Sequence, residues 1–368
     1  MKIISDTIIV PHFYRLNWAR EMSDFLINSG KFKYLGRDLQ YGNYSKAAKL
    51  RDAYLNSLID NCSSITEKRL FFVNLNDYIF FERRLELKDK FEICGFMRGS
   101  RFFEGEPGNC SFDKGELQYM QKMESDALCE ISAIFLGSQS FYNFLSKKIP
   151  NLQKNKIHIL GIPIFIEPCY LNKTDLEVKL LEDNKTKDLI IWNHRLQKQK
   201  NPWVLFELEK FIKTNISVCT PEALSAAYSK EMKQNSLIFK NIIRDNGKKR
   251  DAYLNELKKA KFVLSTSQHE TWGNSMIEAI MNGAAPIAPD GDQCSYSELF
   301  PEEFLYPQSL IHRHKNPITR EDNMIQLSYI IDEMTRISNP ESLRKLQKSL
   351  WDKYNKHTWL ENLVNALQ

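Results

Sequence analysis

Two glutamates eight positions apart flank a strand-to-helix turn in the segment STSQHETWGNSMIEAIMNG, residues 265–283. Glu270 precedes the predicted helix and Glu278 falls within its first turns. A carboxylate in the loop could stabilise positive charge at a sugar carbon, because glycosyl transfer passes through an oxocarbenium-like state. Glu278, near the positive end of the helix dipole, can accept hydrogen bonds from a pair of sugar hydroxyls, or it can simply complement the dipole as a surface residue.

The turn between these glutamates suits an anionic ligand. Gly273, Asn274 and Ser275 lie at the predicted helix start, where backbone N–H groups have no intrahelical acceptor. Gly273 lacks a side chain and therefore allows a ligand to approach the backbone closely. His269, beside Glu270, is as compatible with a structural hydrogen bond as with catalysis.

A second strand, loop and helix of the same type is predicted over DLIIWNHRLQKQKNPWVLFELEKFI, residues 188–212. Asn201 is the expected N-cap of its helix and Pro202 the first helical residue. Arg195 and Lys200 then lie on the loop, where Arg can bind a phosphate with two hydrogen bonds and Lys adds a point charge. Two ordinary surface cations would give the same pattern.

The elements that must position these residues alternate between short apolar strands and longer periodic helices. This alternation predicts βαβ units and parallel sheets covered by helices on both faces. The strands are expected at residues 2–10, 69–75, 91–97, 133–138 and 156–162, and, after a restart near the two prolines of GIPIFIEP, at 188–193, 216–220, 261–267 and 284–289.

The fold expected is therefore α/β, with two doubly wound Rossmann-like domains facing across a cleft. The boundaries predicted are residues 1–166 for the first domain, with a C-terminal helix 351–368 packing back on it, and 167–350 for the second. In such sheets a ligand binds beyond the carboxyl ends of the strands.

Composition narrows the class of protein. The chain has 368 residues, of which 42% are hydrophobic and 26% charged, as in a soluble globular protein, and no apolar run reaches membrane-spanning length. Seven scattered cysteines without a CxxC pair suit the reducing cytoplasm and argue against a zinc or disulfide framework. His312 and His314 lack a further ligand at metal-binding spacing, so no metal site is expected. The net charge of +5 permits an anionic ligand or a nucleic-acid partner.

Taken together, these motifs resemble GT-B glycosyltransferases, and specifically glycosyltransferase family 4. The resemblance is carried by the E-x7-E of Glu270 and Glu278, by the Arg195–Lys200 spacing, and by EAIMNGAAPIAP after the second glutamate. The tRNA-queuosine mannosyltransferase-like branch of the family is nearest, on WNHRLQKQKNP, STSQHE, SMIEA and YSELFPEEFLY. Where relatives place a His after a first-domain strand, this chain reads GFMRGSRFFEG, with Met97 or Arg98 at that place. His12, after the first strand, could face the cleft instead.

The resemblance implies a retaining transferase whose donor, a nucleotide-diphosphate sugar such as a UDP- or GDP-sugar, is held by the second domain. The implied diphosphate ligands are Arg195, Lys200 and the amides near Asn274 and Ser275. Glu278 would bind the ribose. Glu270, a catalytic candidate, would bind the sugar ring, and His269 and Gly273 are further donor-binding candidates.

On the acceptor side, the resemblance leaves His12 as a catalytic candidate and Arg98 as an acceptor-binding candidate. Neither a metal nor another cofactor is implied.

A soluble acceptor is expected, and a modified base in tRNA or DNA is favoured. The alternatives are a polysaccharide or lipid-linked acceptor, a nucleotide-sugar epimerase of the same architecture, and an inactive transferase fold that binds nucleic acid. The last would have no need to keep all four of Arg195, Lys200, Glu270 and Glu278.

Overall fold

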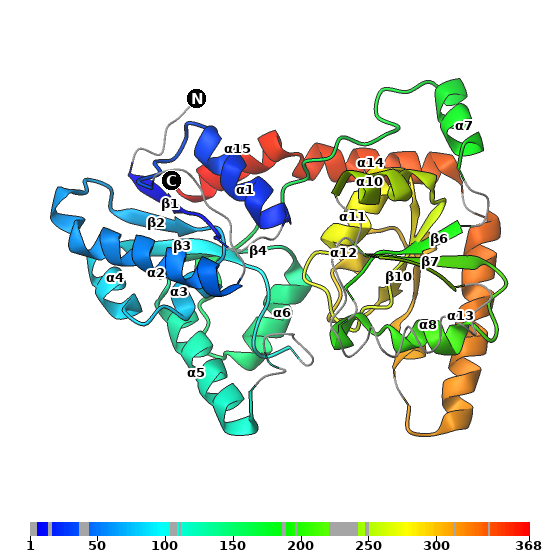
Figure 1. The fold of residues 1–368 in the computed structure, drawn as a ribbon, viewed down its shortest axis with the longest axis horizontal. Helices are drawn as coiled ribbons and strands as arrows, with labels where there is room; N and C mark the ends of the chain where they lie inside the picture. Colours follow the sequence, from blue (N-terminus) through cyan, green and yellow to red (C-terminus); the bar gives the residue numbers. More distant parts are fainter. Residues whose placement is uncertain are drawn as a thin grey trace. The chain divides into compact units, whose positions relative to one another are not determined.

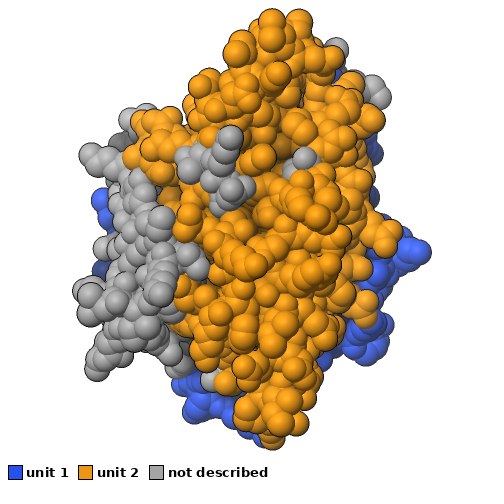
Figure 2. All heavy atoms as spheres, turned by 90° about the vertical axis from the view of Figure 1, so that its right-hand side faces the viewer, with its two compact units in different colours: residues 1–103, 108–165, 356–368 blue, residues 104–107, 166–355 orange. Residues whose placement is uncertain are grey.

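The computed structural model describes residues 6–13, 17–36, 44–103, 109, 112–185, 189–195, 197–220, 242–246, 250–312, 314–337 and 339–368. The chain forms two compact units (Figures 1 and 2). Unit 1 comprises residues 1–103, 108–165 and 356–368, and unit 2 comprises 104–107 and 166–355. The helical stretch from Trp351 onward is divided between the units at Asn355, since α14 (Pro340–Tyr354) belongs to unit 2 and α15 (Lys356–Ala366) to unit 1.

Unit 1 is built on five parallel strands in the order β1-β2-β3-β4-β5. Their bounds are Thr7–Val10, Arg69–Phe72, Glu92–Met97, Ala133–Leu136 and Ile157–Ile159. On the free side of β1, Lys33 forms a parallel bridge with Ile8, so the winding direction reverses at β1. Such a reversal opens a crevice at the carboxyl ends of the strands, and His12 follows β1 at this point.

Alternating apolar residues divide the core of unit 1 between the two faces of the sheet. Ile8, Leu70 and Phe72 belong to one cluster with buried residues of the helices on that face. Phe96 points to the opposite face, where its ring lies 6.4 Å from that of Trp359 in α15. Trp359 is fully buried, and its Nε1 donates to the Gly161 carbonyl at 3.0 Å, so α15 is an integral part of unit 1. The remaining α-helices of this unit are α1 (Asn17–Asn28), α2 (Tyr44–Asp60), α3 (Asn76–Ile79), α4 (Arg84–Lys90), α5 (Lys114–Glu130) and α6 (Gln139–Lys148).

Unit 2 holds six parallel strands in the order β11-β10-β9-β6-β7-β8. In chain order the bounds of β6 to β11 are Leu189–Trp192, Asn215–Thr220, Ile242–Asn246, Phe262–Leu264, Ala285–Asp290 and Leu305–Pro307. The winding reverses between β6 and β9, which places the loops after these two strands at a switch point. The prediction of two parallel, doubly wound sheets is confirmed. The strands β8 and β11 were not predicted, because IIRDN is mostly polar and LYP is very short.

Helices cover both faces of this second sheet (Figure 1). One face is covered by α8 (Trp203–Leu208) and α13 (Pro317–Ile337), and the other by α10 (Arg250–Lys259), α11 (Asn274–Met281) and α14. Unit 2 also contains α7 (Asp175–Asp183) and α12 (Tyr296–Leu299). Short 3-10 turns occur in unit 1 at Cys62–Ser64 and Lys154–Lys156, and in unit 2 at Lys198–Lys200, Glu302–Phe304 and Gln308–Ile311.

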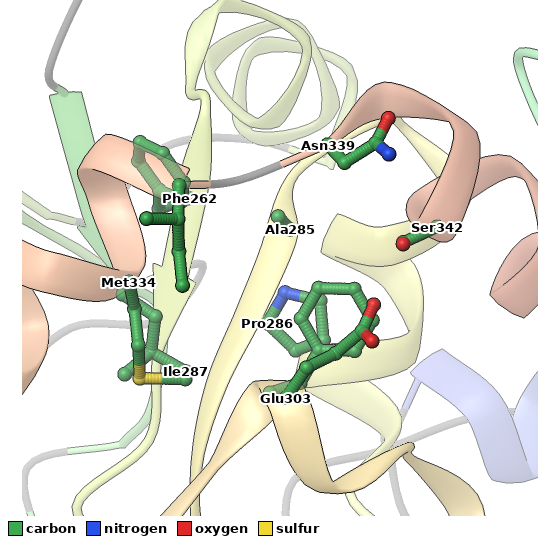
Figure 3. Close-up of a pocket in the computed structure, with 10 residues that line it drawn as sticks. Phe262, Ala285, Pro286, Ile287, Glu303, Met334, Asn339 and Ser342 are labelled. Atoms are coloured by element: carbon green, nitrogen blue, oxygen red, sulfur yellow. The ribbon is translucent and has the colours of Figure 1, made fainter.

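A cavity of about 200 Å³ lies in unit 2 at the amino ends of β9 and β10 (Figure 3). Phe262 and Ala285 begin these strands, and Met334 and Ile337 of α13 also line the cavity. It contains none of the predicted site residues and lies at the edge of the sheet opposite to the loops that carry them.

Two further features concern the chain as a whole. Within the described ranges, none of the helices combines the length and apolar character needed to cross a membrane. The six cysteines that the structure describes are free thiols.

Candidate active site

The loops after β6 and β9 are bonded to each other, which joins the two motifs in unit 2. The Gln268 amide donates to the Gln199 carbonyl at 2.9 Å. Thr266 Oγ1 donates to the Lys200 carbonyl at 2.7 Å and accepts from Trp192 Nε1 at 2.9 Å. The basic loop and the E-x7-E loop therefore form one surface at the switch point of the sheet.

Lys200 and Glu270 form an ion pair at the centre of this surface. Lys200 Nζ lies 2.5 Å from Glu270 Oε2, and the two side chains are only 13% and 14% exposed. Burial alone would raise the pKa of Glu270, but the charge and hydrogen bond of Lys200 outweigh it and hold the pKa below its usual value. Glu270 is therefore an anion whose charge depends on Lys200. Its backbone is fixed as well, because its amide donates to the Gln293 carbonyl at 2.9 Å.

Two buried imidazoles lie in the electrostatic field of this pair. Burial, reinforced by the charge of Lys200, lowers the pKa of His194 to about 3 and that of His269 to about 4. Both rings are therefore uncharged near neutral pH. His194 was missed from the sequence, although its position between a buried strand and Arg195 was a usable signal. Its Nδ1 lies 3.1 Å from the hydroxyl of Ser275.

Glu278 is held by α10. Arg250 Nη2 lies 2.7 Å from Glu278 Oε1, and the Tyr253 hydroxyl donates to Oε2 at 3.1 Å. Asn193 Nδ2 lies 3.0 Å from the Tyr253 hydroxyl and donates to the Ser275 carbonyl at 2.6 Å. Arg250, Tyr253 and Asn193 were not predicted, and together they hold the Glu278 carboxylate in place.

The turn between the glutamates requires a glycine at position 273. Gly273 has φ +86°, and a Cβ there would lie 2.6 Å from Tyr296 Cε1. Helix α11 begins at Asn274, so the amides of Asn274 and Ser275 belong to its first turn. Trp272 is buried against Tyr354, with ring centroids 4.6 Å apart.

The basic loop differs from its prediction at Asn201 and Pro202. Asn201 is not the N-cap of α8, because it adopts a left-handed conformation with φ 56° and its Nδ2 donates to the Ile311 carbonyl at 2.7 Å. Pro202 occupies the cap position and the helix begins at Trp203. Arg195 is exposed on the same loop.

Unit 1 carries its own polar group at the carboxyl ends of its strands. His12 is buried, and its Nδ1 lies 2.7 Å from Asp77 Oδ2 at the start of α3. Asn74, in the loop after β2, lies 3.4 Å from the same nitrogen. Arg98 is half-buried directly after β3. Asp77 and Asn74 were not predicted, because they follow a different strand from His12.

The described residues were also compared with the ligand sets of metal sites. Among the described residues, no group of three or more His, Cys, Asp and Glu side chains is arranged to hold a metal ion.

Comparison with proteins of known structure identifies the fold of the chain. No family model matches the chain. A sucrose-phosphate synthase from Thermosynechococcus elongatus superimposes with a TM-score of 0.67 at 11% identity, covering 98% of each chain. Anabaena HepE, solved in complex with UDP and glucose, gives a TM-score of 0.60 at 12% identity over 94% of this chain and 88% of its own. The chain has the GT-B fold.

The GT-B chain also has a curated relative. It is 29% identical over 181 residues to the tRNA-queuosine alpha-mannosyltransferase of Drosophila melanogaster. That alignment covers 48% of this chain and 47% of the relative, so the match spans about half the length of each. The predicted resemblance to GT-B glycosyltransferases and to this branch is confirmed.

Acidification is expected to destabilise unit 2 of this GT-B protein. Folded His194 and His269 bind a proton only near pH 3 and pH 4, whereas their ordinary pKa is 6.5. Below pH 6.5 the unfolded chain therefore holds more protons, and each histidine lowers the stability by about 1.4 kcal/mol per pH unit until its folded pKa is reached. The lowered pKa of Glu270 adds a loss in the same direction at lower pH.

Thermal unfolding between pH 7.5 and 5 measures this effect. The midpoint should fall with pH, and His194→Gln should reduce the slope, because one of the two protonation differences is gone. His312→Gln, on an exposed residue, is the control and should keep the wild-type slope. Equal slopes in wild type and both variants would contradict the expectation.

Proposed function

We propose that this chain is a retaining glycosyltransferase that transfers a sugar from a UDP- or GDP-sugar. The buried Lys200–Glu270 pair carries this proposal, because it places one cation and one anion beside the first turn of α11. A cation and free amides suit a diphosphate, and the carboxylate suits the positive charge that develops on the sugar. The UDP bound by HepE, which shares the fold, supports a nucleotide donor.

The donor would be bound entirely by unit 2. Arg195 and Lys200 would bind the diphosphate with the amides of Asn274 and Ser275. Glu278, fixed by α10, would bind the ribose, and Glu270 the transferred sugar beside His269. Lys200 would be shared between the diphosphate and Glu270.

The mechanism proposed is a same-face attack assisted by the leaving phosphate. We propose that it needs no metal cofactor, since Arg195, Lys200 and the amides at the start of α11 would supply positive charge and hydrogen bonds to the diphosphate. Positioning and charge stabilisation would then supply most of the rate.

The acceptor proposed is a modified base in tRNA or DNA, bound by unit 1, in the cytoplasm. The similarity to a tRNA-queuosine alpha-mannosyltransferase supports a nucleic-acid acceptor. The mildly basic balance of the chain, with a net charge of +5, is compatible with such a partner.

Two measurements test this function. Shifts in melting temperature with UDP, GDP and ADP identify the donor nucleotide, since a ligand that binds only the folded state raises its stability. Mass spectrometry of tRNA and DNA nucleosides, after incubation with the protein and the matching nucleotide sugar, then reports a hexose or pentose added to a base. If none of the three nucleotides raised the melting temperature, the donor assignment would be contradicted. A sugar transferred only to a lipid or polysaccharide would contradict the acceptor.

The pair of His12 and Asp77 gives a separate prediction about the acceptor side. Asp77 Oδ2 accepts a hydrogen bond from His12 Nδ1–H and so holds one tautomer of the ring. In Asp77→Asn the amide would favour the other tautomer, and we expect kcat to fall about 10- to 100-fold while nucleotide affinity stays unchanged. Asp126→Asn is the matched control, because Asp126 is exposed in the same unit and pairs with Lys122, away from His12 and Asp77. An equal fall in both variants, or weaker nucleotide binding by Asp77→Asn, would contradict the role of Asp77.

A further inference from the structure

His194 is a buried imidazole to which the sequence analysis assigns no role. It follows β6 directly and is only 2% exposed. Its Nδ1 lies 3.1 Å from Ser275 Oγ, and Ser275 is the second residue of α11. The charges of Lys200 and Glu270 both act on the ring. His194 therefore contacts the first turn of α11 and is also within electrostatic range of the Lys200–Glu270 pair.

The two ring nitrogens of His194 are in different situations. Nδ1 has Ser275 Oγ as its partner, whereas Nε2 is buried and has no hydrogen-bond partner among the described residues. A buried polar atom without a partner is unfavourable, and in native proteins it points to a ligand or an ordered water. Because the pKa of the ring is lowered to about 3, the ring is neutral and carries one proton.

The tautomer depends on Ser275 and on the charge of the ligand. If the Ser275 hydroxyl donates to Nδ1, the proton is on Nε2, and His194 offers a hydrogen-bond donor. If Nδ1 donates to Ser275, Nε2 is an acceptor and would repel a phosphate oxygen. An anionic ligand at the start of α11 therefore selects the Nε2–H form.

We propose that His194 Nε2–H donates a hydrogen bond to the distal, sugar-bearing phosphate of the nucleotide donor, and that the Ser275 hydroxyl holds the required tautomer. This inference rests on the proposed function and assigns a specific phosphate to a residue that is not among the predicted site residues. The distal phosphate is the relevant one because it is the phosphate bonded to the sugar. The sugar is the expected partner of Glu270, and the diphosphate is expected at the start of α11. His194 binds it without adding a second buried cation next to Lys200.

The test compares nucleoside diphosphates with nucleoside monophosphates. Calorimetric titrations of the full chain use UDP and UMP, and GDP and GMP. His194→Leu should lose about 10- to 100-fold in affinity for the diphosphate that binds wild type, since a hydrogen bond to a charged group is removed. Affinity for the matching monophosphate should change less than about 3-fold. His194→Gln, which keeps an N–H donor near the Nε2 position, should recover most of the loss and shows that the fold is intact.

Ser275 supplies an independent arm of the experiment. Ser275→Ala should weaken diphosphate binding in the wild-type background and have no further effect in His194→Leu, because Ser275 acts through the ring. Equal losses for diphosphate and monophosphate, unchanged diphosphate affinity in His194→Leu, or additive effects of the two substitutions would overturn the inference. The wild-type titration alone reports on the proposed function. Failure of the wild type to bind either UDP or GDP would remove both the proposed function and this inference, whereas normal wild-type binding isolates the role of His194.

Discussion

Replacing Lys200 by methionine is expected to lower the free energy of unfolding by about 3 kcal/mol and to reduce sugar transfer at least about 100-fold. The substitution leaves Glu270 buried without its cation, and its side chain is only 14% exposed. An uncompensated buried charge is strongly unfavourable, so the pKa of Glu270 should rise and the carboxyl group should become easier to protonate. Transfer should be lost because the variant lacks the Lys200 cation proposed to bind the diphosphate. The Glu270 carboxylate, proposed to lie beside the sugar, would also lose negative charge.

The double variant Lys200→Met with Glu270→Gln separates stability from activity. Without a buried charge to compensate, it should regain stability to within about 1 kcal/mol of wild type and remain inactive. Lys122→Met is the matched control. Its partner Asp126 lies 2.7 Å away, but the pair is largely exposed, so the loss should stay below about 0.5 kcal/mol. Chemical denaturation and a transfer assay on the four proteins check this. Active Lys200→Met protein would contradict the assignment of the pair.

Replacing Gly273 by alanine is expected to destabilise unit 2 by about 2 to 4 kcal/mol and to abolish nucleotide binding. Gly273 has φ +86°, a conformation that is strained for any residue with a Cβ. The added Cβ would also lie 2.6 Å from Tyr296 Cε1. Tyr296 cannot move freely, because it is fully buried, stacks on Phe300, and its hydroxyl lies 3.0 Å from Ser265 Oγ. The start of α11 should therefore shift, and with it the amides of the diphosphate site.

Gly115→Ala is the control for this substitution. Gly115 lies in the first turn of α5, and a Cβ there would meet only Asp113 Oδ1, at 3.4 Å. Alanine in a helix is about 0.5 kcal/mol more favourable than glycine, so this variant should be as stable as wild type or slightly more so. Thermal unfolding and UDP or GDP titration of both variants measure the effect. Wild-type nucleotide affinity in Gly273→Ala would show that the turn does not hold the phosphate.

The Lys200–Glu270 contact illustrates how far sequence reasoning reached. Both residues were predicted for the donor site from two separate strand–loop–helix patterns. Their pairing at 2.5 Å joins positions 70 residues apart and depends on β6 and β9 being neighbours in the sheet. The local pattern contains no information on which strands are adjacent, because β7 and β8 intervene in the chain.

The same limit explains the residues that were missed. His194 contacts Ser275 across 81 positions, and Asp77 contacts His12 across 65. Tyr253 reaches Glu278 from a neighbouring helix. Each of these side chains has an ordinary local context, and only its distant partner gives it a role. Asn201 shows the converse, since its cap signal was overridden by a tertiary hydrogen bond to Ile311.

The sequence by itself therefore determined the strand and helix alternation, the two parallel sheets, the glycine turn and the residue types that could bind a nucleotide sugar. These depend on apolar periodicity, backbone permissiveness and charge, which are properties of neighbouring residues. The tertiary structure alone decided the ionic partner of Glu270, the neutral state of His194 and His269, and the support of Glu278 by α10. Burial and the order of the strands set these features, and both emerge only when distant segments pack together.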